Sequence, residues 1–385
     1  MNFDFDKMTD RRGTGSSKWD VPEGVIPLSI ADMDFECAPA IRRALEERIR
    51  NGIYGYTDIG EEWYSAYIGW WQSRHGFTMK RGGLVFATGV VPAISSAVRK
   101  LTTPAEKVLL LTPVYNIFFN SILNNGRLVL ECPLLYNSDC TYSVDFGALE
   151  AGLADPQTSL MILCNPHNPV GKIWDRETLA KIGELAANNG VTVLSDEIHC
   201  DITLPGRDYI PFASVSDTCR EISVTCISPT KTFSIPGLQT AAVYAENKTL
   251  RHKMWRALNT DEVAEPNVLA AIAPTAAFTG GAEWLDGLRE YLRENREIAE
   301  KFIKSHIPCI KITPADATYL MWLNVAALGG GGSLSAAAEE HRLILCPGSH
   351  YGEGGRDFVR VNIATPRKRL LDGLARLARA AGAGI

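Results

Sequence analysis

Residues 222–237 read Ile222-Ser-Val-Thr-Cys-Ile-Ser-Pro-Thr-Lys-Thr-Phe-Ser-Ile-Pro-Gly237. The first six residues are rich in apolar and β-branched side chains, which predicts a buried strand. The strand passes directly into a turn that contains hydroxyls, two prolines and one lysine, Lys231. In open α/β sheets, ligands bind beyond the carboxyl ends of the strands. The stretch therefore predicts an α/β fold with a candidate functional lysine at the edge of its sheet.

Further apolar runs lie between residues 84 and 246 and alternate with helix-like segments. The predicted strands are Leu84–Ala87, Val108–Leu111, Leu128–Glu131, Leu160–Cys164, Val191–Leu194, Ile222–Ile227 and Thr240–Tyr244. Most are continuously apolar, as in strands that are covered on both faces. Helical patterns at Pro92–Leu101 and Glu177–Asn188 separate them, and Gly190 is suited to end the second helix. This alternation predicts a mostly parallel, doubly wound sheet.

The C-terminal part of the chain has a different pattern. It contains a long charged helix at Asp286–His306, strand-like runs at Ala317–Val325, Arg342–Cys346 and Phe358–Ile363, and a final helix from Pro366. This order predicts a small α+β domain, with which the N-terminal residues are expected to pack. The predicted division is 46–285 for a large domain, and 1–45 with 286–385 for a small one.

The glycine run Gly329–Ser333 interrupts this part of the chain. It resembles a flexible linker in composition but is short. A mobile surface loop before a helix at Ser333–His341 is therefore expected, rather than a domain boundary.

Composition limits the classes of function. With 385 residues, 46% of them hydrophobic and 22% charged, the chain matches a soluble globular enzyme of more than one domain. Its net charge of −5 includes no basic block, so nucleic acid is not an expected partner. No apolar run approaches the ~20 residues that span a bilayer, and the N-terminus lacks a signal-peptide pattern. We therefore expect a cytoplasmic protein with no membrane partner.

The nine cysteines are scattered and form no C-x-x-C pair. Several lie inside apolar runs, which favours buried free thiols in a reducing compartment. Neither a disulfide framework nor a metal site is expected.

Lys231 has two interpretations. Most lysines beside a turn are solvated, but an amine at a strand end can also form a Schiff base with pyridoxal 5′-phosphate (PLP). In the second case the hydroxyls of Ser228 and Thr230, together with backbone N–H groups, hold the phosphate. Asp196, directly after the run Val191–Leu194, suits the same chemistry, because a buried carboxylate needs a cation such as the pyridinium nitrogen. The alternative for Asp196 is a helix cap.

Three further strand ends carry suitable groups. Leu160–Cys164 continues into Asn165-Pro-His-Asn-Pro-Val-Gly171, where Asn168 either donates to the phenolate oxygen of PLP or initiates a turn. Leu84–Ala87 continues into Thr88-Gly-Val-Val-Pro92, and the free N–H groups at this helix start suit a phosphate. Tyr115 ends another strand, and its ring either stacks on the pyridine or packs in the core.

The order of these motifs is Thr-Gly, Pro-x-Tyr, Asn-Pro-x-Asn-Pro-x-Gly, Ser-Asp-Glu and Ser-Pro-x-Lys. In this order they resemble the fold-type I PLP enzymes of the class I and II aminotransferase group, over nearly the whole chain. The resemblance implies a Schiff base at Lys231, contact of Asp196 with the pyridine nitrogen, and donation from Asn168 to the phenolate oxygen. It also implies ring stacking by Tyr115, and phosphate binding by Ser228 and by the amides of Gly89, Val90 and Val91. Lys231, Asp196 and Tyr115 are the expected catalytic residues.

The same resemblance assigns residues outside the cofactor motifs. Arg360, in Phe358-Val-Arg-Val-Asn362, matches the arginine that binds the α-carboxylate of the substrate. Its planar guanidinium suits bidentate pairing with a carboxylate. Tyr56 matches a tyrosine that reaches the phosphate of the neighbouring subunit. A homodimer with shared sites is therefore implied.

Four stretches narrow the resemblance to the cystathionine β-lyase, or C–S lyase, branch. They are Arg11-Arg-Gly-Thr-Gly-Ser-Ser-Lys-Trp-Asp20, Ile30-Ala-Asp-Met-Asp-Phe35, Ser195-Asp-Glu-Ile-His-Cys-Asp201 and Lys231-Thr-Phe-Ser-Ile-Pro-Gly-Leu238. By the resemblance, Asp32 binds substrate, and Trp19 and residues 32–35 help line the pocket. His199 replaces a tyrosine that transaminases carry near the phenolate oxygen, so it either contacts the cofactor or is a structural histidine. Gln239 replaces a phosphate-binding arginine.

The expected reaction is β-elimination from an S-substituted cysteine such as cystathionine, giving pyruvate, ammonia and a thiol. Lys231 is expected to act as general base at Cα, and therefore to have a pKa well below that of a free lysine. The same residues also suit an aminotransferase, which is the alternative. A non-catalytic binding protein on this scaffold is disfavoured because the catalytic residue types are all present.

Overall fold

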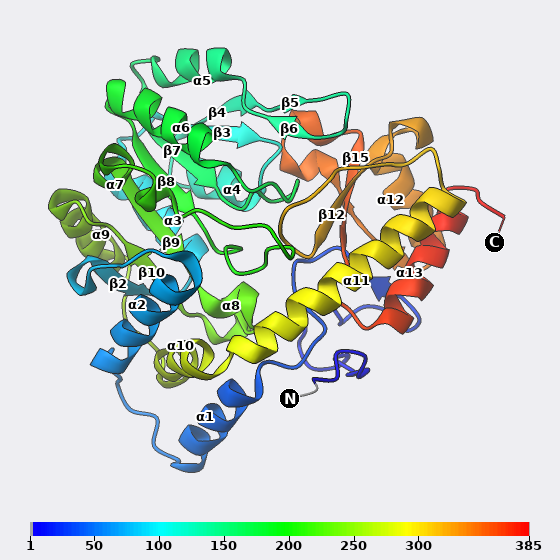
Figure 1. Ribbon diagram of the computed structural model, residues 1–385, viewed down its shortest axis with the longest axis horizontal. Helices are drawn as coiled ribbons and strands as arrows, with labels where there is room; N and C mark the ends of the chain where they lie inside the picture. The colour runs from blue at the N-terminus through cyan, green and yellow to red at the C-terminus, as the bar shows by residue number, and fades with distance from the viewer. Residues whose placement is uncertain (1–2, 385) are drawn as a thin grey trace.

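A computed structural model describes residues 3–384 of the chain, and a seven-stranded sheet forms its centre (Figure 1). The strand order is β2 (Leu84–Ala87), β10 (Ala241–Tyr244), β9 (Ser223–Ile227), β8 (Thr192–Asp196), β7 (Thr158–Cys164), β3 (Lys107–Thr112) and β4 (Leu128–Pro133). Only β10 runs antiparallel to its neighbours. All seven predicted strands are present, and the expected mostly parallel α/β fold is confirmed.

Helices cover both faces of this sheet, and the side chains of the central strands alternate between two cores. Along β7, Leu160, Ile162 and Cys164 belong to one core, whereas Met161 and Leu163 belong to the other. The first core is completed by α3 (Val90–Leu101), α4 (Ile117–Leu123) and α9 (Lys248–Thr260). The second is completed by α5 (Phe146–Leu153), α6 (Arg176–Asn188) and α7 (Asp217–Ile222). Burial on both faces explains why these strands are continuously apolar.

A second, antiparallel sheet lies in the C-terminal part of the chain. Its order is β11 (Lys311–Ile312), β12 (Leu320–Asn324), β15 (Phe358–Asn362) and β14 (Cys346–Pro347). Helices α12 (Gly330–Glu340) and α13 (Arg367–Ala380) pack beside it. The N-terminal strand β1 (Ile26–Pro27) pairs with β13 (Leu343–Ile344), so the N-terminal segment reaches this part of the molecule as expected.

A long helix connects the two regions. Helix α10 (Val268–Gly280) packs against α1 (Pro39–Arg50) and α2 (Glu61–His75), and α11 (Ala282–His306) extends from it towards the small sheet (Figure 1). The remaining elements are the short helix α8 (Pro229–Thr232), the hairpin β5 (Leu135–Tyr136) and β6 (Tyr142–Ser143), and the 3-10 turns Arg81–Gly83, Phe212–Ser214, Pro236–Leu238, Ala326–Leu328, Gly348–Tyr351 and Glu353–Gly355.

The glycine run after residue 328 is not the expected mobile loop. Gly330 to Gly332 form the first turn of α12. A Cβ at Gly331 would collide with the backbone carbonyl oxygen of Phe358. Since Phe358 begins β15, Gly331 allows α12 to pack closely on this strand. The glycine-rich composition of this run suggested a flexible loop. Composition gives no information about the contact with β15, so it could not show that the run is part of a packed helix.

Both predicted domain boundaries fall inside helices. Residue 46 lies within α1, and residue 286 lies within α11. Helix α1 packs against α10. The division into a large and a small domain stays a prediction.

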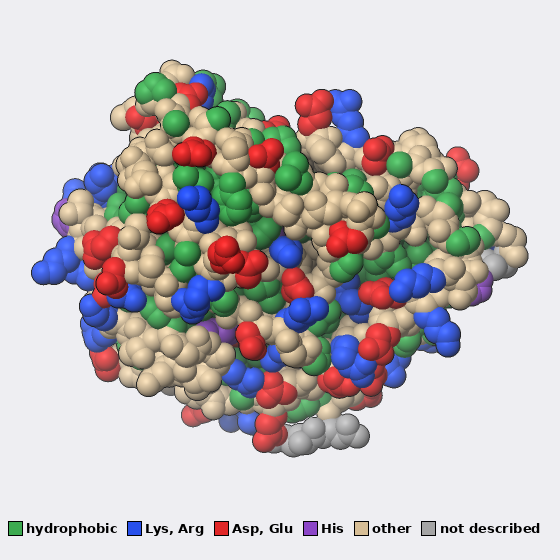
Figure 2. All heavy atoms as spheres, turned by 45° about the horizontal axis from the view of Figure 1, so that its top comes forward, with side chains coloured by type: hydrophobic (Ala, Val, Ile, Leu, Met, Phe, Trp, Pro, Cys, Tyr) green, Lys and Arg blue, Asp and Glu red, His purple; other side chains and the backbone are tan. Residues whose placement is uncertain are grey.

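Both signs of charge are interspersed over the face of the molecule in Figure 2. All nine cysteines are free thiols, as expected from their scatter. Within residues 3–384 no single helix has the length and apolarity to cross a bilayer, whereas α10 and α11, bent by 77°, meet both criteria only as a pair.

Candidate active site

A cavity of about 370 Å³ opens beyond the carboxyl ends of the parallel strands. Ten of the residues that line it were predicted as site residues or flank one in the same motif: Thr88, Gly89, Val90, Val91, Tyr115, Asn168, Asp196, His199, Thr230 and Lys231. They come from the ends of β2, β3, β7, β8 and β9. The parallel arrangement of these strands thus brings distant segments to one edge of the sheet.

Lys231 lies in α8, one short helical turn after β9. The N-cap Ser228 orients this turn by accepting from the N–H of Thr230 at 3.1 Å. The Lys231 amine donates to the carbonyl oxygen of Ala31. Burial lowers the pKa of Lys231 to about 8, despite the opposing charges of Asp32 and Asp196. A buried amine with this pKa can act as a nucleophile or base near neutral pH.

Asp196 ends β8 and is 4% exposed. Its carboxylate accepts from the N–H of Ile198 at 3.1 Å and forms an ion pair with no described residue. Burial raises the pKa of Asp196 to about 7. A cationic N–H group placed in the cavity would supply the missing partner, as the protonated pyridine of PLP does. The adjacent Glu197 is structural, because it accepts from Ser195, Tyr209 and the N–H of Phe212.

Arg360 lies at the centre of β15 in the small sheet and does not itself line the cavity, but it contacts the cavity-lining Asn168. Its Nη1 donates to Asn168 Oδ1 at 3.2 Å, and its Nη2 donates to the carbonyl oxygen of Ser29 at 2.8 Å. Its Nε is buried without a hydrogen-bond partner, and no described carboxylate lies within ion-pair distance. Tyr351 lies under the guanidinium, 5.0 Å from it. A buried, uncompensated guanidinium is suited to an anionic ligand such as a substrate carboxylate.

His199 is buried and its Nδ1 has no hydrogen-bond partner. Burial, and then the charges of Lys231 and Arg360, lower its pKa to about 3, so the ring is neutral. Asn168 also lines the cavity, and none of residues 3–384 accepts from its Nδ2. Tyr115 is half-buried, and burial raises its pKa. These unsatisfied groups fit a ligand with polar ring substituents, which supports the PLP assignment.

The predicted phosphate site is partly rearranged. Gly89 precedes α3, and the first N–H groups of that helix face the cavity beside Thr230 and Gln239. The hydroxyl of Ser228 instead donates to the carbonyl oxygen of Thr240 at 2.7 Å. Ser228 therefore caps α8, and of the two predicted hydroxyls only Thr230 lines the cavity.

Four predicted residues do not line this cavity: Ser228, Arg360, Asp32 and Tyr56. Asp32 lines a second cavity of about 730 Å³, which shares Ala31, Lys231 and Pro236 with the first. Tyr56 is fully exposed on an extended segment after α1. Its contact with a neighbouring subunit stays a prediction.

Tyr319 was not predicted as a site residue. Its hydroxyl donates to the same Ala31 carbonyl oxygen that accepts from Lys231, at 3.1 Å. Its ring lies 6.1 Å from that of His199. Tyr319 directly precedes β12, and the apolar run that predicted this strand gave no sign of the tyrosine's position beside Lys231.

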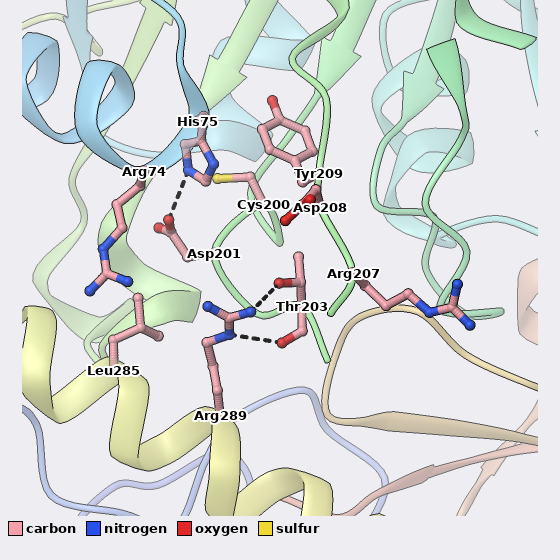
Figure 3. Close-up of a pocket in the computed structure, with 10 residues that line it drawn as sticks. All are labelled: Arg74, His75, Cys200, Asp201, Thr203, Arg207, Asp208, Tyr209, Leu285 and Arg289. Carbon is pink, nitrogen blue, oxygen red and sulfur yellow. Dashed lines mark hydrogen bonds and ion pairs between the residues drawn. The ribbon is translucent and has the colours of Figure 1, made fainter. Parts of the chain in front are cut away.

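A third cavity, of about 230 Å³, is lined by residues of α2, of the segment after β8 and of α11 (Figure 3). There Asp201 accepts from His75 Nε2 at 3.0 Å, Trp70 Nε1 at 2.8 Å and Thr232 Oγ1 at 2.9 Å. Because Thr232 adjoins Lys231, this network ties the lysine turn to α2. Asp201 and His75 lie within 4.8 Å of the Cys200 thiol, but the carboxylate is already satisfied and burial raises the pKa of that thiol, so we assign no metal here.

Comparison with known proteins agrees with this geometry. Residues 23–377 match the family model for class I and II aminotransferases. The chain is 42% identical to the cystathionine β-lyase PatB of Bacillus subtilis (strain 168), over 97% of this chain and 99% of that protein. It is 34% identical to the protein MalY of Escherichia coli (strain K12), over 98% of each. The crystal structure of cystalysin from Treponema denticola, which contains PLP, has 30% identity and a TM-score of 0.95, over 99% of each chain.

Proposed function

The chain belongs to the class I and II aminotransferase family, and we propose that it is a PLP-dependent carbon–sulfur β-lyase. It cleaves cystathionine or related S-substituted cysteines to pyruvate, ammonia and a thiol. One observation carries the amino-acid chemistry: the buried Lys231 amine, whose pKa is lowered, lines the cavity, and the guanidinium of Arg360, which has no carboxylate partner, donates to the cavity-lining Asn168. The choice of C–S cleavage within the family is supported by the 42% identity with a cystathionine β-lyase.

Lys231, Asp196, Asn168, His199, Tyr115, Thr230 and the first N–H groups of α3 are the residues that would hold PLP. When bound, PLP supplies an aldehyde that condenses with amines and a ring that accepts electron density from the substrate Cα. Asp196 would accept a hydrogen bond from the N–H of the ring and would thereby keep that nitrogen protonated. Because residue 239 is a glutamine and not an arginine, Lys231 is the only cationic side chain among the cavity-lining residues. We therefore assign phosphate binding to the first N–H groups of α3 and to Thr230.

Arg360 binds the α-carboxylate of the substrate and so orients the Cα–H bond towards Lys231. The Lys231 amine, neutral in a substantial fraction of molecules near pH 8, then accepts the Cα proton. The carbon–sulfur bond breaks, and the sulfur leaves as a thiolate.

The test is to supply the purified protein with PLP and cystathionine without any 2-oxo acid. Release of pyruvate and thiol over many turnovers is the expected result. A single turnover that resumes only after a 2-oxo acid is added would instead identify an aminotransferase. Lys231→Ala is the control, and C–S cleavage that persists in it would refute the assigned role of Lys231.

The functional unit is a homodimer in which Tyr56 reaches the site of the neighbouring subunit. The segment around Tyr56 supports this, because Ile49, Ile53, Tyr54 and Tyr56 are 50%, 71%, 59% and 106% exposed. Large apolar side chains gathered on one exposed segment mark an interaction site. Nine free thiols support a cytoplasmic location.

A further inference from the structure

The larger of the two adjoining cavities extends away from the residues that would hold the cofactor. It has a volume of about 730 Å³, and Lys231 lies on the wall that it shares with the smaller cavity. A substrate whose Cα lies at the Lys231 amine therefore has room for a long group on its sulfur. That group would lie between the N-terminal segment and residues 30–37.

Two acidic side chains along this cavity are already neutralised. Asp34 is paired with Lys18 at 2.9 Å and with Arg369 at 3.1 Å. Glu36 is paired with Lys7 at 2.5 Å. Neither carboxylate is left to bind a cationic group of a substrate.

Arg11 and Asp32 differ from Asp34 and Glu36, because each has a polar side-chain atom with no hydrogen-bond partner in the described chain. Arg11 Nη2 donates to Asp32 Oδ2 at 2.7 Å, and Arg11 Nη1 donates to the carbonyl oxygen of Met33 at 2.9 Å. Within the described chain nothing donates to Asp32 Oδ1, and Arg11 Nε donates to nothing. The two side chains are 27% and 17% exposed, and both line the cavity.

The position of Asp32 is well determined. Its carbonyl oxygen accepts from Lys18 Nζ at 2.7 Å and from Asn362 Nδ2 at 2.9 Å. Its carboxylate also opposes the lowering of the Lys231 pKa, so it lies within electrostatic reach of the reacting amine. A carboxylate that is fixed at this position can bind a cationic group a few bonds beyond the sulfur atom of the C–S bond that is cleaved.

We propose that Arg11 and Asp32 form a second recognition site, for an amino-acid head group carried beyond the substrate sulfur. The carboxylate of that head group accepts from Arg11 Nε, and its ammonium group donates to Asp32 Oδ1. Both charges of the zwitterion are then paired while the Arg11–Asp32 ion pair stays intact. The inference rests on the proposed function and names its substrate class: thioethers and disulfides that join cysteine to a second amino acid, in preference to S-alkyl cysteines.

The test compares cystathionine with S-ethyl-L-cysteine, which lacks the second head group. In Arg11→Met and in Asp32→Asn, the ratio of kcat/KM for cystathionine to kcat/KM for S-ethyl-L-cysteine is expected to fall about tenfold or more, mainly through KM. Arg12→Met is the matched control, because Arg12 adjoins Arg11, is 35% exposed and does not line the cavity. Its ratio is expected to match that of the unaltered protein.

An unchanged ratio in either Arg11→Met or Asp32→Asn would overturn the inference, as would an equal fall in Arg12→Met. Unaltered protein that cleaves S-ethyl-L-cysteine but not cystathionine would also overturn it, while leaving C–S cleavage in place. Unaltered protein that cleaves neither substrate would remove the proposed function and the inference together.

Discussion

Arg360 and Asn168, 192 residues apart in the chain, are joined by a hydrogen bond of 3.2 Å between Arg360 Nη1 and Asn168 Oδ1. Arg360 belongs to the small antiparallel sheet, whereas Asn168 follows a strand of the large parallel one. The bond therefore links the guanidinium proposed to bind the substrate carboxylate with the loop proposed to contact the cofactor. Arg360 Nε is buried and has no hydrogen-bond partner among the described residues.

Replacing Arg360 by methionine removes this carboxylate-binding group. We expect kcat/KM for cystathionine to fall by at least about 30-fold, since loss of one partner from a buried charge pair costs about 2 kcal/mol or more. The absorbance of bound PLP is expected to persist. The control is Arg356→Met, whose side chain is 74% exposed just before the same strand. An equal loss in the control would assign the effect to the strand rather than to the guanidinium.

Replacing Asp196 by asparagine has opposite effects with and without PLP. Burial raises the pKa of Asp196 from 3.8 to about 7, so the folded protein without PLP binds this proton more tightly than the unfolded chain does. The stability that this provides is present below pH 4 and is lost as the pH rises through about 7. Relative to the unaltered protein, Asp196→Asn without PLP should therefore gain stability between pH 4 and pH 8, by up to about 4 kcal/mol.

With PLP present, Asp196→Asn should bind the cofactor more weakly, because the pyridine nitrogen loses its anionic partner. Urea unfolding at several pH values measures the first effect, and titration with PLP measures the second. A variant without PLP that shows no pH-dependent gain would mean that Asp196 is not held in the environment described.

Replacing Asp201 by alanine tests the hydrogen-bond network around this carboxylate, of which Figure 3 shows the bond to His75. Burial raises the pKa of Asp201, but the hydrogen bonds and charge of His75, with Trp70 and Thr232, bring it below its usual value. The stability from Asp201 is therefore present above about pH 4 and is lost as the pH falls through the lower pKa of the folded state. We expect a loss of about 3–5 kcal/mol at pH 7 that shrinks in acid.

Asp208→Ala is the matched control for Asp201, because Asp208 lines the same cavity but is exposed. It should change the free energy of unfolding by no more than about 0.5 kcal/mol. Equal effects of the two substitutions in urea unfolding would contradict the structural role of Asp201.

The glycines of α12 differ sharply in their surroundings. A Cβ at Gly331 would strike the carbonyl oxygen of Phe358, whereas a Cβ at Gly332 would meet nothing within 4 Å. Gly331→Ala should therefore lower the melting temperature and reduce binding of substrate at Arg360, two residues along β15. Gly332→Ala should raise the free energy of unfolding by about 0.5–1 kcal/mol, since alanine is the better helix former. Similar melting temperatures for the two variants would contradict the packing of α12 on β15.

The site at the strand ends could be predicted because each part of it is local in sequence. A buried strand followed by Asp196 or Lys231 places a charged group at the sheet edge whatever the rest of the chain does. The positions of Tyr319 and Arg11 could not be predicted from local patterns, since they depend on how the small sheet and the N-terminal segment dock. The orientation of Ser228 could not be predicted either, because its hydroxyl donates to the carbonyl oxygen of Thr240.

The placement of Arg360 on the second sheet has a consequence for the newly made chain. A ribosome completes Asn168, Asp196 and Lys231 well before it reaches Arg360. The residues proposed to hold PLP are therefore synthesised before the residue proposed to bind the substrate carboxylate.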